Sequence, residues 1–156
     1  MGAGSFNAGH PIMFESVSNV TATPSVQLGT RTIVNGEDYC YIYNAAADTA
    51  TKDHGVIITA MTGYSISLQS VTMVGGFFGL VKHADIPAAS YGWVLTKGFG
   101  QGLAGTTKSL ATGDPLVCGV SGTFGRNTGA ATAYCNGFVI NGAATAATAD
   151  VFFVGM

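Results

Sequence analysis

The chain has 156 residues, of which 9% are charged, and its formal net charge at pH 7 is −2. This length suits one domain with a real core, but ordinary soluble domains carry about 25% charged residues. Six scattered cations and a negative net charge argue against a nucleic-acid partner, which needs a basic stripe. Because interface cores are depleted in charge, we expect other protein to cover much of the surface. The alternative is a soluble domain with a surface rich in Thr, Ser and Asn.

Residues 1–14 are rich in Gly, Ala and Asn and end on the apolar cluster Ile12, Met13 and Phe14. We predict an extended N-terminal arm over 1–14 and a single domain over 15–156. The three apolar residues are candidate partner contacts, although a frayed terminus or burial of Phe14 in the core would also explain them. The N-terminus lacks the regions of a signal peptide. No apolar run approaches the roughly 20 residues of a membrane helix, so no membrane partner is expected.

Strand signals begin after Pro24. Residues 31–34 and 39–43 are β-prone and flank Asn35-Gly36, a pair suited to the positive φ angles of a tight hairpin turn. The intervening Glu37-Asp38 predicts a loop slightly longer than two residues. In the second strand three tyrosines at alternate positions share one face, which suits a core edge or an interface.

The middle of the chain continues this pattern. Residues 56–60 form a short apolar run typical of a buried strand, and residues 64–74 alternate but slip phase by one, which indicates a bulge or bend. Residues 84–90 could form one helical turn. Residues 91–97 return to strand, with Tyr91 and Trp93 expected in the core. The glycine-rich run 98–105 lacks the following helix of a phosphate-binding loop, so we interpret it as a flexible connection between strands.

Three further strands are predicted, over residues 116–120, 138–140 and 151–154, each beside turn signals. The Ala-rich segments 45–50 and 143–149 are diluted by Thr and are interpreted as loops or strand edges. Seven to nine short strands with frequent turns predict an all-β fold: a single-domain antiparallel β-barrel or sandwich with an extended N-terminal arm.

The cysteines and histidines do not form a chemical motif. Cys40, Cys118 and Cys135 lie in apolar settings without a C-x-x-C pair, which predicts buried free thiols in a reducing compartment; one disulfide and a spare thiol is the alternative. His10, His54 and His83 lack metal-ligand spacing. No nucleophile elbow or supported carboxylate pair is present. We therefore expect no enzyme, no catalytic or cofactor-binding residues, no cofactor and no metal.

Three segments resemble the head decoration, or cement, proteins of tailed bacteriophages. They are Leu28–Asn44, with its LGT turn, glycine hairpin and aromatic strand; Tyr91–Gly98, beginning YGWV; and Leu110–Val117, with its A-x-G-D-x-L-V turn. The resemblance spans residues 28 to about 125, and Leu95 stands where the family pattern has Gln.

This resemblance implies a β-tulip or jelly-roll domain that binds the outside of a capsid built from an HK97-type major capsid protein. It implies a dimer or trimer made in the host cytoplasm, which bridges capsid subunits on the virion. Ile12, Met13 and Phe14 are then candidate capsid contacts. The alternatives are a subunit of a phage tail or other filament, and a small soluble ligand-binding barrel or enzyme.

Overall fold

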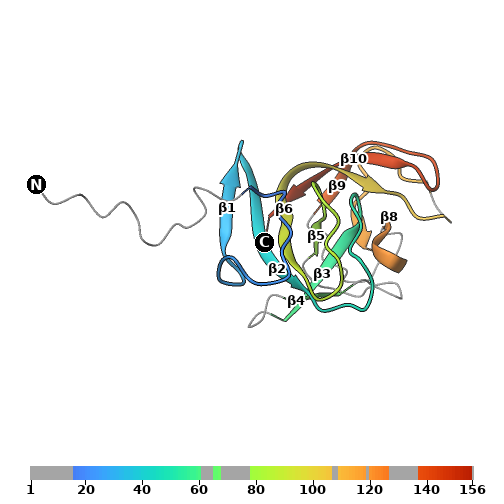
Figure 1. Ribbon diagram of the computed structural model, residues 1–156. Helices are drawn as coiled ribbons and strands as arrows, with labels where there is room; N and C mark the ends of the chain where they lie inside the picture. Colours follow the sequence, from blue (N-terminus) through green and yellow to red (C-terminus); the bar gives the residue numbers. More distant parts are fainter. Residues whose placement is uncertain are drawn as a thin grey trace, which may run out of the picture.

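The computed structural model describes residues 16–60, 65–67, 78–106, 109–118, 120–126 and 137–155. These ranges are built from β-strands and a short 3₁₀ turn over Val120–Gly122 (Figure 1). The strands are β1 (Arg31–Val34), β2 (Glu37–Asn44), β3 (Gly55–Ala60), β4 (Ser65–Ser67), β5 (Phe78–Leu80), β6 (Tyr91–Leu103), β7 (Leu116–Cys118), β8 (Phe124–Arg126), β9 (Gly137–Asn141) and β10 (Thr148–Val154).

One large sheet organises the molecule. Its strand order is β1-β2-β4-β3-β5-β6-β10-β9, and a further ladder joins β2 to β6, so the sheet folds back on itself. The β2–β4 ladder is parallel, and the other ladders between described strands are antiparallel. Strands β7 and β8 form a separate two-stranded sheet. In Figure 1, β1 and β2 lie at one side of the molecule and β9 and β10 at the other.

The all-β, antiparallel character predicted from the sequence is confirmed. In the described ranges β1 and β9 end the large sheet, so its eight strands do not form one closed barrel, although the β2–β6 ladder joins β2, β4, β3, β5 and β6 into a ring. A sandwich-like arrangement is compatible with the two sheets. The jelly-roll or β-tulip type, the arm over 1–14 and the domain bounds 15–156 stay predictions, since residues 1–15 lie outside the described ranges.

The first hairpin is tighter than predicted. Val34 pairs with Glu37, which leaves a two-residue turn in which Asn35 has φ 53° and Gly36 has φ 81°. Two positive φ angles give a turn whose twist matches the strands it joins. Glu37 and Asp38 therefore belong to β2 and not to a longer loop.

Two predictions in the middle of the chain are wrong. Residues 84–90 form no helical turn, because Ile86 pairs in a bridge with Ala50 and places the segment against the sheet. The run 98–105 is not a flexible connection, because β6 continues to Leu103 and pairs with β10. Its glycines allow close packing: a Cβ at Gly100 would lie 2.2 Å from Leu80 Cδ2. Only a residue without a side chain fits there.

The other predicted strands are present, with shifted ends. The strand predicted over 56–60 is β3, those over 138–140 and 151–154 are β9 and β10, and that over 116–120 stops at Cys118. Of the strand predicted over 64–74, β4 covers 65–67 and residues 64 and 68–74 lie outside the described ranges. Segment 45–50 is loop with one bridging residue, and 143–149 is loop leading into β10, as predicted.

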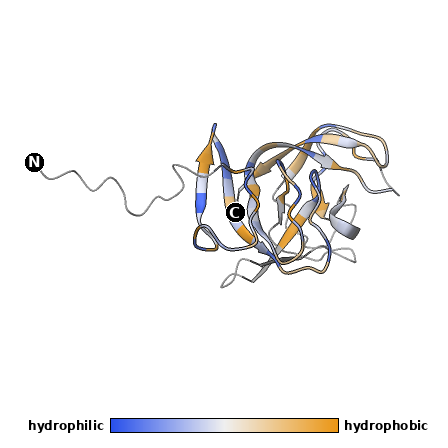
Figure 2. Cartoon of the chain, in the orientation of Figure 1, coloured by the Kyte–Doolittle hydropathy of each residue, from blue (hydrophilic) through white to orange (hydrophobic). Residues whose placement is uncertain are grey.

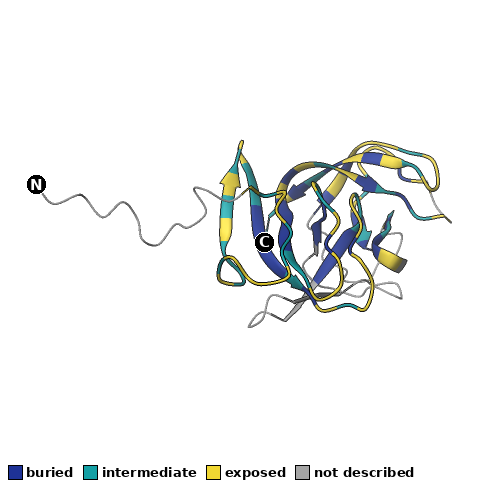
Figure 3. Cartoon of the chain, viewed as in Figure 1, coloured by how far each residue is buried: buried dark blue, intermediate teal, exposed yellow. Residues whose placement is uncertain are grey.

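The core has two parts because the middle of β2 and the first half of β6, up to Thr96, are buried on both faces (Figure 3). Alternate residues of β2 divide between them: Tyr39 and Tyr41 join one cluster, and Cys40 and Ile42 join the other. Trp93 is 3% exposed within the first cluster, which confirms its predicted place in the core, and Tyr91 packs partly buried against it. Two buried faces explain why these strands carry few charges.

Candidate interaction surface

An exposed apolar surface lies on the outer side of β6, β10 and β9. Alternation along each strand turns one set of side chains into the core and the other outward. In β10, for example, Val151 and Phe153 are fully buried, whereas Val154 is 55% exposed. We call this surface the aromatic face, and it comprises Phe99, Phe138, Ile140, Phe152 and Val154.

Three phenylalanines form a row across the aromatic face. Phe152 pairs in register with Phe99 on β6 and with Phe138 on β9. Its ring centroid lies 4.7 Å from that of Phe99 and 5.5 Å from that of Phe138. Cross-strand aromatic pairs of this kind stabilise a sheet, yet Phe99 remains 59% exposed and Phe138 37% exposed. The row therefore presents a contiguous apolar surface that the described residues leave uncovered.

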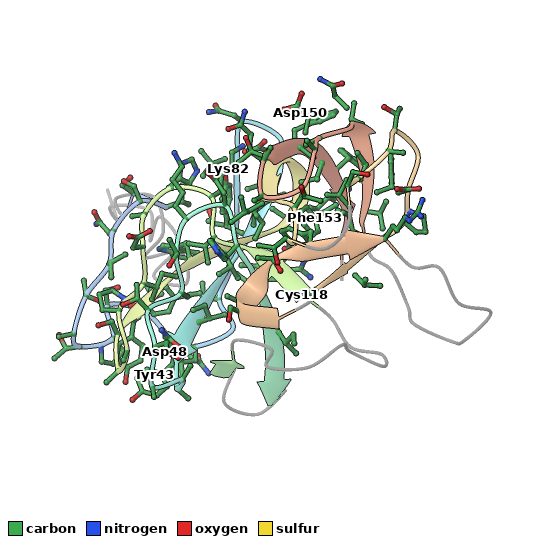
Figure 4. The ribbon with its side chains drawn as sticks, turned by 90° about the vertical axis from the view of Figure 1, so that its right-hand side faces the viewer. Tyr43, Asp48, Lys82, Cys118, Asp150 and Phe153 are labelled. Carbon is green, nitrogen blue, oxygen red and sulfur yellow. The ribbon has the colours of Figure 1, made fainter. Side chains whose placement is uncertain are left out.

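Charged residues flank the aromatic row on its two sides. On one side Lys97 pairs with Val154, and on the other Gln101 pairs with Asp150. Lys97 and Asp150 are both exposed, and Asn141 Nδ2 donates a 3.4 Å hydrogen bond to Asp150 Oδ2. In Figure 4 Asp150 lies at the outer side of the molecule and Phe153 lies below it. The aromatic face thus has a positive end and a negative end.

A polar cluster supports the backbone of Phe99. Lys82 Nζ donates a 2.8 Å hydrogen bond to the Phe99 carbonyl oxygen and a 2.6 Å bond to Glu37 Oε1. Tyr39 Oη donates a 2.7 Å bond to Glu37 Oε2, and its oxygen lies 2.8 Å from His83 Nε2. The cluster therefore ties the start of β2 and the segment after β5 to the strand that carries Phe99.

The protonation states of this cluster follow from its contacts. Burial raises the pKa of Glu37, but the hydrogen bonds from Lys82 and Tyr39 and the Lys82 charge outweigh it, and the net pKa is lowered. Burial, together with the bond to Glu37, raises the pKa of Tyr39. Burial and the Lys82 charge lower the pKa of His83. The carboxylate is engaged by two donors, so the arrangement suits bracing of the backbone better than proton transfer.

Some of the residues singled out in the sequence lie within the described ranges, and others do not. The candidate contacts Ile12, Met13 and Phe14 lie outside the described residues, as do His10 and Cys135. Cys40 and Cys118 are buried and free, as predicted for them, and Cys118 packs beside Gly55. Burial raises the pKa of Cys40 to about 11 and that of Cys118 to about 12.

Among the described residues, no group of three or more His, Cys, Asp or Glu side chains could hold a metal ion. The described part of the chain also holds no helix long and apolar enough to cross a membrane.

Sequence reasoning missed the aromatic face. The predicted layout places Phe99 in a connection, and it places Phe138 and Phe152 in strands without assigning them to a face. The available signal was the alternation of Lys97, Phe99 and Gln101, with glycine at each position between them. Such a strand buries only backbone and displays its side chains on one side.

Comparison with known proteins identifies a likeness of fold. No family model and no curated protein matches the chain. Among solved structures, it is similar to one described as the head fiber gp8.5 N base in bacteriophage phi29, with a TM-score of 0.50 and 14% sequence identity. The match covers 76% of this chain and 98% of that chain. At this identity the likeness establishes a shared fold.

Proposed function

We propose that this chain is a bacteriophage capsid decoration, or cement, protein. In this role it binds the outer surface of a shell of major capsid protein with an HK97-type fold and bridges neighbouring subunits. It acts by contact and not by catalysis, and it occupies the virion surface after synthesis in the host cytoplasm. The observation that carries the proposal is the likeness to a base domain that is described as part of a phage head fiber, over 98% of that domain.

Two properties of the chain support a role in an assembly. Only 9% of its residues are charged, so its surface is poorly suited to remain solvated on all sides. Among the described residues, the aromatic face also leaves large apolar side chains uncovered, Phe99 at 59% and Val154 at 55% exposure. Adjoining exposed apolar residues mark surfaces at which proteins meet.

The mechanism of a cement protein is mechanical. A protein that contacts two capsid subunits at once must lose both contacts before the subunits separate. The folded sheet supplies a rigid body between these contacts, since β2 and the first half of β6 contribute side chains to both core clusters. We propose that the N-terminal arm supplies one contact, with Ile12, Met13 and Phe14 laid into a groove or beside an exposed strand of a capsid subunit.

The first test is reconstitution on a shell. The full chain is mixed with shells of the major capsid protein encoded by the same viral genome, and the mixture is sedimented and imaged by electron cryomicroscopy. Regularly placed density that touches more than one capsid subunit supports the proposal. A chain that stays in the supernatant at saturating concentration contradicts it.

A variant separates the arm from the domain. Replacing Ile12, Met13 and Phe14 together by Ser is expected to weaken sedimentation with shells at least tenfold while leaving the circular dichroism spectrum unchanged. The matched control is Ile33→Ser, because Ile33 is 71% exposed on β1, at the apolar end of that strand in Figure 2. Equal binding by both variants would reject the arm as the anchor.

The fold likeness favours one second candidate, the base on which a head fiber stands. A base would carry density of a fiber that projects outward from the shell. A cement protein covers the shell without such projections, so the same images discriminate between the two roles.

A further inference from the structure

We infer that the aromatic face is an interface between two copies of this chain, related by a two-fold axis that runs along the row Phe99, Phe152 and Phe138. This inference rests on the proposed structural role, and it names one partner within the assembly, a second copy of this chain. The Phe rings of one copy would pack on those of the other, with the two sheets stacked about 10 Å apart.

The size of the aromatic face suits the centre of a dimer interface. Phe99 is 59%, Val154 55%, Ile140 40% and Phe138 37% exposed. At the ~150–250 Å² that a large apolar side chain presents, these fractions leave on the order of 350 Å² of apolar surface. A stable interface buries about 800 Å² on each partner, with an apolar centre and a polar rim. The flanking rows, which hold Lys97 and Asp150, supply that rim.

The charges make the aromatic face complementary to itself. Rotation about the aromatic row exchanges its two sides, so the Lys97–Val154 row of one copy faces the Gln101–Asp150 row of the other. Each lysine then lies one strand away from the partner's aspartate, within reach of its long side chain. Two Lys97–Asp150 pairs form by symmetry, as in an isologous contact.

Within the part of the chain that the structure describes, neither Lys97 nor Asp150 forms a salt bridge. In the described ranges, the salt bridges join Lys82 to Glu37 and Arg31 to Asp38. Asp150 accepts a long bond from Asn141, and a carboxylate with one such bond can still accept a second donor.

The alternative axis, parallel to the strands, matches the charges poorly. Rotation about an axis parallel to the strands does not exchange the two flanking rows. The Lys97–Val154 row of one copy would then face the same row of the other copy, and Lys97 would not approach Asp150. The aromatic rows would still overlap, but the charged ends would stay apart. Charge pattern therefore selects the axis along the row, since complementary charges fix the register of an interface.

The backbone that carries the rings is braced before association, and the three rings contact one another. The outward residues of β10 alternate with Val151 and Phe153, both fully buried. The Phe99 carbonyl accepts a hydrogen bond from Lys82, which Glu37 holds. Ordering cost on binding is small when side chains are already fixed by their neighbours.

The first experiment measures association of the full chain by sedimentation equilibrium over a range of concentrations. Wild type is expected to dimerise, and Phe99→Ser is expected to weaken the dimer at least tenfold. Ile33→Ser, on β1 at the opposite end of the sheet, is the control and should leave association unchanged. Circular dichroism confirms that each variant is folded. A wild-type chain that stays monomeric, or equal effects of the two variants, would overturn the interface.

A charge exchange tests the axis. Lys97→Glu and Asp150→Lys are each expected to weaken the dimer roughly tenfold, because two pairs are lost and two like-charge contacts are formed. The double variant restores both pairs and should recover wild-type association. The difference in dimer affinity between the double variant and the single variants should also decrease as the salt concentration increases. A double variant as weak as either single variant would overturn the two-fold arrangement.

The outcome is independent of shell binding. A monomer that sediments with shells would refute the dimer and leave the cement role standing. A dimer that does not sediment with shells would refute the cement role and leave the dimer interface standing.

Discussion

At the scale of single residues, Glu37 shows how position decides chemistry. In the sequence it follows a turn, where a carboxylate normally points to water. In the structure its side chain is 17% exposed and accepts hydrogen bonds from Lys82 and Tyr39. Such charge-assisted bonds favour the ionised carboxylate, which explains why the pKa of Glu37 is lowered although burial alone would raise it.

This pKa predicts a pH-dependent stability. The folded pKa of Glu37 lies below the ordinary 4.5, so the unfolded chain takes up a proton more readily as the pH falls. The stabilisation is therefore complete at neutral pH and is lost as the pH falls below about 4.5 through the folded pKa. At pH 7 Glu37→Gln should lower the free energy of unfolding by about 1–2 kcal/mol. Urea denaturation at pH 7 and at pH 3 measures the difference.

A second variant checks the cause. Lys82→Met removes the main partner of Glu37, so Glu37→Gln in that background should cost clearly less at pH 7. Equal costs in both backgrounds would show that Lys82 is not the source of the effect.

At the scale of elements, β6 explains how a glycine-rich run becomes the central strand of a sheet. Its 13 residues pair with β2 along the first half and with β10 along the second. Gly100 and Gly102 face Leu80 and Phe124, whose side chains occupy the space that a Cβ would need. Glycine usually weakens a strand, but here it lets core side chains approach the backbone.

The predicted consequence is a large cost for one added methyl group. Gly100→Ala places a Cβ 2.2 Å from Leu80 Cδ2, and Leu80 is fully buried, so neighbouring core side chains must shift. Overpacking of this kind costs about 1–3 kcal/mol of unfolding free energy.

The matched control is Gly125→Ala in β8. Its nearest contact would be Val117 Cγ2 at 3.6 Å, an ordinary van der Waals distance, so the change should be close to neutral. Thermal and urea denaturation of both variants measure the difference. Similar costs for the two would contradict the packing explanation.

At the scale of the whole molecule, the small sheet shares the core of the large one. Leu116, Cys118 and Phe124 belong to the same buried cluster as Tyr39 and Tyr41. The ring of Phe124 lies 6.0 Å from that of Phe153 on β10. Because a shared core couples the two sheets, we expect the domain to unfold as one cooperative unit.

Cysteine labelling tests this cooperativity. Cys40 lies on β2 of the large sheet and Cys118 on β7 of the small one. Burial raises the pKa of these thiols to about 11 and about 12, so neither should react with a thiol reagent at pH 8 while the chain is folded. In a Cys135→Ser background, both should become labelled at the urea concentration at which Trp93 fluorescence changes. Earlier labelling of Cys118 would show that the small sheet opens on its own.

Local patterns along the chain are enough to predict the fold class and much of the strand layout. Alternation and turn residues predict β1, β2, β3, β9 and β10, because these signals act over a few neighbouring residues. Low charge likewise indicates a covered surface without any knowledge of the fold. Local signals failed at Glu37 and Asp38, which resemble loop residues, and at run 98–105, where glycine normally indicates flexibility.

The residues that form the candidate surface depend on how distant strands pair. Phe99, Phe138 and Phe152 are far apart in the chain and meet because β6, β10 and β9 pair in one register. Lys82 and Glu37 are 45 residues apart and meet under Phe99 because β2 and β5 both pair with β6. Register depends on packing between distant strands, and no periodicity within one strand encodes its partner. Alternation within each strand assigns its side chains to two opposite faces. The pairing of the strands then determines which of these faces stays exposed.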